Sequence, residues 1–132
     1  MSDTEFIHVY ALERDREYVE RVQAGTVEAG ELALRTDNGL FGSSQWWAAI
    51  RKGTVPTERI EGMIVKLYKQ GEWPEFSVDA DGQRTSWAMD GDVSYYEEGK
   101  RVRIDFVTLE YQNPKPNGEA STRAVLGIWI EP

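Results

Sequence analysis

Five segments of alternating apolar and polar residues between residues 59 and 130 constrain the fold of this chain most strongly. They cover residues 59–69, 75–79, 85–89, 100–111 and 124–130. Successive side chains on a strand point to opposite faces of the sheet, so a period of two residues predicts β-strands. The stretch DADGQ between the second and third segments carries an Asp-Gly turn signal, which predicts a hairpin turn at residues 79–83. The region is therefore predicted to be an antiparallel β-meander.

Two of the segments carry additional information. Residues 59–69 have apolar side chains on both faces, which predicts a central strand that is buried on both sides. In residues 100–111 the apolar positions change phase near Phe106, which predicts a bulge or a bend. Five strands with such a bend fit a small, strongly bent antiparallel sheet or a partly open barrel of the OB or SH3 kind, with an open β-sandwich as the alternative.

The N-terminal third combines strand and helix signals. Residues 5–12, EFIHVYAL, are rich in aromatic and β-branched types and favour a strand. From Asp15 the spacing becomes helical and predicts a short surface helix that ends at Gly25. A second helix is predicted within residues 42–53, GSSQWWAAIRKG, where a serine can cap the start and Gly53 the end. Together with the length of 132 residues, this predicts a single domain over 1–132, in which residues 1–57 pack on or plug the 59–130 meander.

The adjacent indoles of Trp46 and Trp47 need an explanation. On a helix, Trp46, Trp47 and Ile50 lie within an arc of about 100 degrees, so both rings can turn toward the sheet. The favoured interpretation is a helix that plugs one open end of the barrel, with one tryptophan buried and the other half covered at the rim. The alternative interpretation is a platform for a ligand.

The charge balance argues against several classes of partner. The chain has 15 basic and 23 acidic residues, a formal net charge of −8, which is the wrong sign for binding phosphates of nucleic acids or anionic membranes. No apolar run approaches the roughly 18 residues of a membrane helix, and the start MSDTEFIHVY lacks the features of a secretory signal. The chain has no cysteine, which excludes disulfides and thiolate metal sites. A cytoplasmic protein is expected.

No motif predicts catalysis or metal binding. His8 is the single histidine, so a two-histidine metal site is excluded, and no nucleophile or phosphate-loop pattern accompanies it. The sequences DADG and DGD place pairs of aspartates two residues apart, as hard cations prefer, but they lack the spacing of a calcium loop. They are predicted to be hairpin turns, and no catalytic residue, cofactor or metal site is predicted.

Acidic and aromatic residues alternate between Glu72 and Glu98. This stretch holds eight acidic residues against the single basic Arg84. Its aromatic residues Phe76 and Trp87 are expected in the core. The other rings lie near turns and are less expected to be buried. Tryptophan and tyrosine are enriched at binding hot spots, so the stretch predicts a surface for a protein partner, and a basic partner would fit it. The candidate contact residues are Trp73, Tyr95, Tyr96, Glu97 and Glu98, together with Trp46 and Trp47.

These features favour a non-catalytic binding or accessory domain that acts through protein–protein contacts. One alternative is a single-stranded nucleic-acid-binding module of OB type, supported by Lys100, Arg101 and Arg103 but opposed by the net charge. Another is a small enzyme or a small-ligand-binding protein. The sequence identifies neither the partner nor the oligomeric state.

Overall fold

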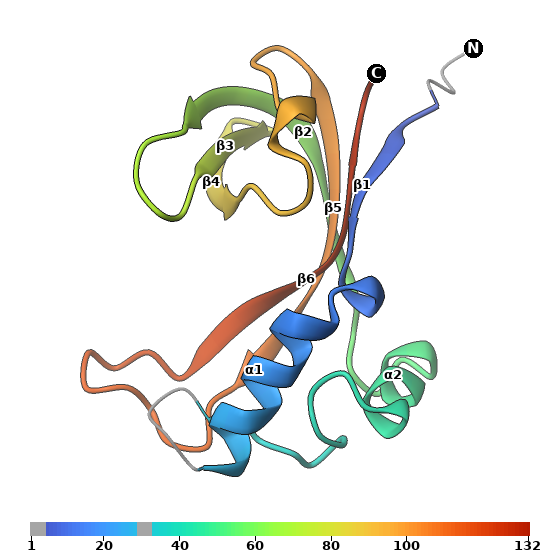
Figure 1. Cartoon of the computed structure of the whole chain (residues 1–132), viewed down its shortest axis with the longest axis vertical. Coiled ribbons are helices and arrows are strands. Elements are labelled where there is room, and N and C mark those ends of the chain that lie inside the picture. Colours follow the sequence, from blue (N-terminus) through green and yellow to red (C-terminus); the bar gives the residue numbers. More distant parts are fainter. Residues whose placement is uncertain (1–4, 29–32) are drawn as a thin grey trace. The chain divides into compact units, whose positions relative to one another are not determined.

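The computed structural model describes residues 5–28 and 33–132. The strands form one antiparallel sheet in the order β1-β6-β5-β2-β3-β4, which is not closed (Figure 1). The prediction of a mainly β fold with a bent antiparallel sheet and two short helices is confirmed. In chain order the elements are β1 (Ile7–Ala11), η1 (Leu12–Arg14), α1 (Arg16–Val27), α2 (Ser44–Arg51), β2 (Glu58–Tyr68), β3 (Glu75–Ala80), β4 (Gln83–Ala88), η2 (Val93–Tyr95), β5 (Arg101–Glu110) and β6 (Ser121–Ile130).

The chain divides into two compact units. Unit 1 contains residues 1–11, 59–105 and 126–132, and unit 2 contains residues 12–58 and 106–125. Strands β5 and β6 therefore each contribute one part to unit 1 and another to unit 2. The division in β5 falls at the predicted change of phase, where the neighbours Phe106 and Val107 are both buried. The buried side chains alternate at Val102, Ile104 and Phe106 and then continue with Val107, so the predicted change of phase is confirmed.

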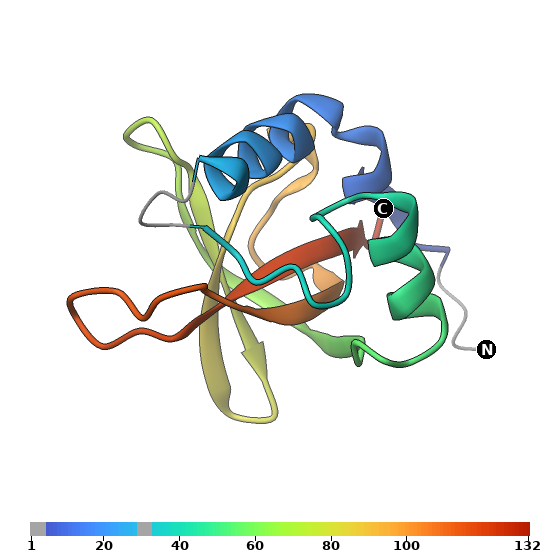
Figure 2. The ribbon, with the colours of Figure 1, turned by 90° about the horizontal axis from the view of Figure 1, so that it is seen from below.

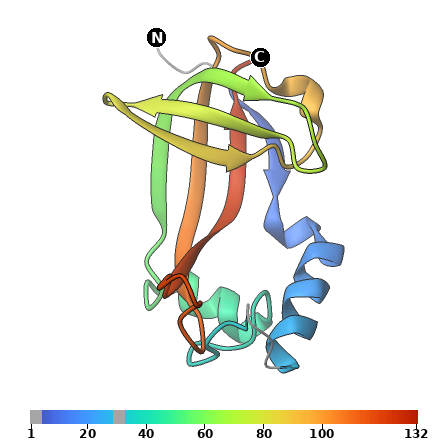
Figure 3. The ribbon, with the colours of Figure 1, turned by 90° about the vertical axis from the view of Figure 1, so that its left-hand side faces the viewer.

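The β3–β4 hairpin confirms the predicted turn in unit 1. Asp81 and Gly82 occupy the two central positions with φ angles of 53° and 82°. Positive φ at both central residues is the geometry that matches the twist of a tight hairpin. The hairpin brings Phe76 opposite Trp87, and both rings are buried, as the sequence predicted. Figure 3 shows β2 curving into this hairpin.

The prediction that β2 is buried on both faces is wrong. Ile64 is buried, but Met63 and Tyr68 are exposed. The pairing of β2 with β3 shifts by one residue between Ile64 and Lys66, which marks a β-bulge. Because of this shift, Leu67 shares a face with Ile64, while Met63 and Tyr68 lie on the other face. Strand β2 therefore turns Ile64 and Leu67 toward the core, and Met63 and Tyr68 lie on its exposed face.

Both predicted helices are present in unit 2, one of them longer than predicted. The carboxylate of Asp15 caps α1, but the helix continues through Gly25 to Val27, so the predicted end at Gly25 is wrong. Glycine weakens a helix without necessarily ending it, and here the backbone bonds continue past it. The hydroxyl of Ser43 caps α2 by accepting a hydrogen bond of 3.2 Å from the backbone N–H of Trp46. Neither helix of the described residues is long and apolar enough to cross a membrane.

The segment between the helices attaches to the β5–β6 hairpin. Leu34 forms an isolated bridge with Tyr111, and the N–H of Arg35 donates to the carbonyl of Glu110 over 2.9 Å. Figure 2 shows this segment passing beside the hairpin before α2 begins. These bonds bring residues distant in sequence into one neighbourhood of unit 2.

Candidate protein-binding surface

Trp73 is the most exposed of the predicted aromatic contact residues. It lies in the turn between β2 and β3, and 73% of its surface is accessible. The acidic residues Glu72 and Glu75 beside it are also exposed. A large ring held outside the core in an acidic turn is available for contact with another molecule.

Tyr95 and Tyr96 point to different environments. Tyr95 ends the 3-10 turn η2 and is 36% exposed, and Glu97 and Glu98 follow it on the surface. Tyr96 is only 1% exposed, and its ring packs against Phe76 with a centroid distance of 4.8 Å. It is a core residue, and its ring is not accessible to a partner.

The buried Tyr96 also makes a hydrogen bond through its hydroxyl. Its hydroxyl donates a hydrogen bond to the backbone carbonyl of Asp90. Burial raises the pKa of the Tyr96 hydroxyl, and the nearby negative charge of Asp90 raises it further. The hydroxyl therefore stays protonated and keeps the connection that precedes β5 attached to the core of unit 1.

The two exposed turns are neighbours. The N–H of Met89 donates to the carbonyl of Pro74 over 2.9 Å, which joins the end of β4 to the turn that carries Trp73. The contact between Tyr96 and Phe76 holds the following connection against the start of β3. We call the exposed residues of these turns the acidic–aromatic surface, and define it as Glu72, Trp73, Glu75, Tyr95, Glu97 and Glu98.

The carboxylates of this surface are weakly compensated. Glu97 pairs with Lys100 over 3.0 Å. Glu72, Glu75 and Glu98 form no ion pair with any residue of the described ranges. Unit 1 as a whole has 13 acidic and 7 basic residues. The surface therefore presents negative charge beside accessible rings, which suits a partner with basic groups.

Other polar residues singled out by the sequence have structural roles. Asp79 accepts a hydrogen bond from the N–H of Gly82, and Asp92 accepts one from the N–H of Ser94. The first contact stabilises the predicted hairpin turn. The prediction of a hairpin turn at Asp90–Asp92 is wrong, because this segment connects β4 to β5, which are not neighbours in the sheet. The ring of His8 stacks on Trp129 in unit 1, with centroids 4.4 Å apart. Within residues 5–28 and 33–132, no group of three or more histidine, aspartate or glutamate side chains could hold a metal ion.

Trp46 and Trp47 belong to unit 2 and differ in exposure. Trp46 is 3% exposed and packs against Phe41 with a centroid distance of 4.8 Å. Trp47 lies nearly perpendicular to it, is half-buried, and lines a hollow of ≈ 250 Å³ with Arg16 and Gln23 of α1. One indole is thus in the core, and the second covers part of its rim.

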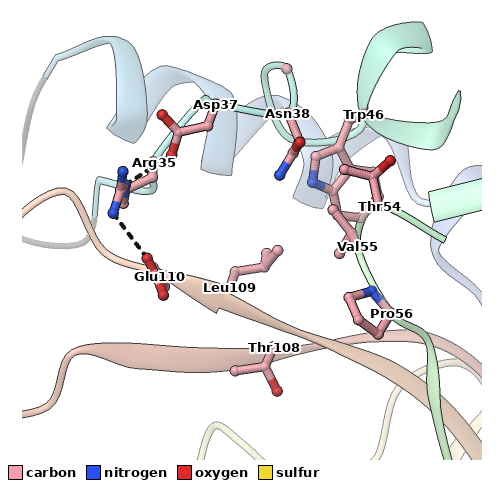
Figure 4. Close-up of a pocket in the computed structure, with 11 residues that line it drawn as sticks. Arg35, Asp37, Asn38, Trp46, Thr54, Val55, Pro56, Thr108, Leu109 and Glu110 are labelled. Atoms are coloured by element: carbon pink, nitrogen blue, oxygen red, sulfur yellow. Dashed lines mark hydrogen bonds and ion pairs between the residues drawn. The ribbon is translucent and has the colours of Figure 1, made fainter. Parts of the chain in front are cut away.

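A second hollow of ≈ 240 Å³ in unit 2 was not predicted (Figure 4). Arg35 stands at its rim and forms two ion pairs, with Asp37 over 2.9 Å and with Glu110 over 3.0 Å. Arg35 and Glu110 are 75 residues apart in the sequence, so no local pattern links them. The other residues that line the hollow are Asn38, Gly39, Trp46, Thr54, Val55, Pro56, Thr108 and Leu109. We call it the Arg35 pocket.

The chemistry of the Arg35 pocket suits recognition. Both rim carboxylates are bound to the same guanidinium and are largely exposed. The wall and floor add apolar surface from Val55 and Leu109 and hydroxyls from Thr54 and Thr108. A few polar groups around an apolar floor orient a bound group.

One comparison with known proteins gave a match, to a protein family. The family model described as "Immunity protein RhsI2" matches residues 6–131. The match therefore includes every strand and helix of the described ranges. No curated protein matches the chain.

Proposed function

Because the chain belongs to the RhsI2 immunity protein family, we propose that it binds an Rhs toxin and blocks its action without catalysis. The family match over residues 6–131 carries this proposal. An immunity protein of this kind needs a surface that recognises one partner tightly, and it needs no catalytic group. We place this surface on unit 1.

The acidic–aromatic surface is the contact that we propose for the toxin. Trp73 and Tyr95 supply exposed rings of the types that dominate binding energy at interfaces. The carboxylates of Glu72, Glu75 and Glu98 supply negative charge that no neighbouring cation neutralises within the described ranges. Charge of this kind speeds association with a basic surface and selects against acidic ones. The expected partner face is therefore basic, with apolar recesses for the rings.

The test begins with the toxin itself. The Rhs toxin domain of the same organism is produced in cells with and without this chain, and growth is followed. We expect growth only when the chain is present, and we expect the two proteins to purify as a complex. Unprotected cells and separate proteins would refute the proposed function.

The surface is tested on the purified complex by calorimetry. The double variant Trp73→Ala, Tyr95→Ala should weaken toxin binding by roughly 30-fold or more, as expected for the loss of hot-spot residues. The charge variant Glu72→Gln, Glu98→Gln should also weaken it. The matched control Glu17→Gln, Glu28→Gln makes the same change of charge on α1 and should bind as the unchanged protein does. Equal affinity of all three variants would place the contact elsewhere on the chain.

A further inference from the structure

The indole nitrogen of Trp46 is a hydrogen-bond donor without an acceptor. The residue is 3% exposed, and its indole N–H bonds to none of the residues that the structure describes. The same ranges contain no fully buried side-chain nitrogen or oxygen without a partner, so this nitrogen is partly accessible, and Trp46 lines the Arg35 pocket. Figure 4 shows it on the side of the ring that faces the hollow.

The indole is fixed in this orientation. Its ring packs on Phe41 at 4.8 Å and against Trp47 at 5.0 Å, and the Ser43 cap holds the backbone of the residue. Turning the ring away would break these contacts and open a cavity in unit 2. The N–H is therefore a preorganised donor at the wall of the pocket.

The rim offers acceptors. Asp37 and Glu110 each use one carboxylate oxygen to bind Arg35, and their side chains are 65% and 64% exposed. The second oxygen of each carboxylate has no partner among the described residues. With one guanidinium and two carboxylates, the rim carries a net charge of −1.

The Trp46 N–H and the rim carboxylates together determine which chemical group can bind in the Arg35 pocket. A carboxylate would accept from the Trp46 N–H but would be repelled by the negative rim, and an ammonium or guanidinium would satisfy the rim but has no acceptor for the indole. An uncharged amide can do both, because its oxygen accepts while its NH₂ group donates. The volume of ≈ 240 Å³ lies below the range of about 300–1,000 Å³ typical of small-molecule pockets, which favours a single side chain.

We propose that the Arg35 pocket receives the amide side chain of an asparagine or glutamine from the bound toxin. The amide oxygen accepts from the Trp46 indole N–H, and the amide NH₂ donates to Glu110 or Asp37. The apolar stem of the side chain packs against Val55 and Leu109. This inference rests on the proposed function for the identity of the partner, but the pocket chemistry can be tested without it.

The first experiment uses the isolated chain. The chain has five tryptophans, and comparison with the variant Trp46→Phe identifies the resonance of the Trp46 indole N–H in a ¹⁵N spectrum. N-acetylglutamine amide, sodium acetate and guanidinium chloride are then added separately, up to the limit of solubility at matched ionic strength. We expect only the uncharged amide to move the Trp46 resonance selectively. No selective shift, or a larger shift with either ion, would overturn the proposal.

The second experiment uses the toxin complex. Trp46→Phe keeps an aromatic ring but loses the pyrrole part of the indole with its N–H, so it should weaken toxin binding by about tenfold, the size expected for one buried hydrogen bond. The control Trp129→Phe makes the same change in unit 1, at a ring that stacks on His8 and does not line this pocket, and should leave the affinity unchanged. Melting temperatures of both variants show whether the fold is kept.

The outcomes separate the two proposals. Tight toxin binding with full affinity of Trp46→Phe would overturn the amide pocket and leave the proposed function standing. A selective response to the amide probe in a chain that binds no toxin would overturn the proposed function and leave the amide chemistry of the pocket standing. A folded Trp46→Phe variant with tenfold weaker binding supports both.

Discussion

Gly91 packs so closely on Val9 that a Cβ atom at residue 91 would lie 2.3 Å from the carbonyl oxygen of Val9. Val9 belongs to β1 and Gly91 follows β4, and these strands are the two edges of the open sheet. The connection after β4 thus approaches the opposite edge of the sheet within unit 1. A residue without a side chain suits this contact, since the two nearest atoms, the carbonyl oxygen and carbon of Val9, belong to the backbone.

The first prediction is that Gly91→Ala destabilises the protein by roughly 2–5 kcal/mol, from the cost of a positive φ together with the clash at Val9. Gly91 has a φ of +80°. The control is Gly71→Ala, because Gly71 has a φ of +94° but open space around it. It should cost only about 1–2 kcal/mol. Urea denaturation measures both, and equal losses would mean that the contact with Val9 contributes nothing.

The second prediction concerns Tyr96 and pH. Burial and Asp90 raise the pKa of the Tyr96 hydroxyl above its ordinary value, so the folded protein keeps a proton that the unfolded chain loses above about pH 10. The stability that this group contributes is complete below that pH and is lost as pH rises beyond it.

Tyr96→Phe provides the measurement for this prediction. At about pH 8 the variant should lose about 1 kcal/mol of stability with the hydrogen bond to Asp90, and the difference from the unchanged protein should shrink at about pH 10.5. Urea midpoints followed by circular dichroism at the two pH values test this. A difference that is independent of pH would contradict it.

The third prediction compares two apolar strand residues, Ile104 of β5 and Leu126 of β6. Ile104 is fully buried, whereas Leu126 is half-buried. Ile104→Ala should cost roughly 2–5 kcal/mol, and Leu126→Ala should cost less because fewer of its contacts are lost. Met63→Ala, at an exposed position of β2, should stay within about 0.5 kcal/mol and serves as the control. The reverse order in denaturation experiments would show that the inward faces are misassigned.

Local signals were sufficient to predict the fold class. The alternation of residues 75–89 and the Asp81-Gly82 turn act over a few residues, and so does the Ser43 cap of α2. The change of phase near Phe106 was also visible in the sequence. The apolar residues occupy even-numbered positions up to Phe106 and odd-numbered positions from Val107 onward. Each of these features follows from neighbours along the chain.

The features that were missed depend on contacts across the chain. The bulge after Ile64 is set by the pairing with β3, and apolar residues alone do not show which face of β2 another segment covers. Adjacent Tyr95 and Tyr96 are equivalent in composition, and only the turn η2 decides which ring meets Phe76. Arg35 pairs with Glu110, which is 75 residues away in the sequence, so no local sequence motif could predict the pocket.

The fourth prediction is that the chain does not bind nucleic acid strongly. Its net charge is −8, and Arg103 of β5 pairs with Glu61 over 3.1 Å. Fluorescence anisotropy with mixed-sequence single-stranded DNA and RNA at physiological salt measures this. Submicromolar binding that weakens steeply with salt would be the signature of phosphate contacts and would contradict the prediction.

The last prediction concerns the rate at which the toxin complex forms. If the acidic–aromatic surface meets a basic partner, added salt should slow association while dissociation changes little, because screening acts on the approach of the two surfaces. The variant Glu72→Gln, Glu98→Gln should associate more slowly at low salt and depend less on salt, because two uncompensated carboxylates of the surface are gone. The control Glu17→Gln, Glu28→Gln has the same total charge but leaves this surface intact, so it should keep most of the salt dependence. Stopped-flow mixing over a series of salt concentrations provides the rates. Identical salt slopes for the two variants would mean that total charge, and not the acidic–aromatic surface, governs the encounter.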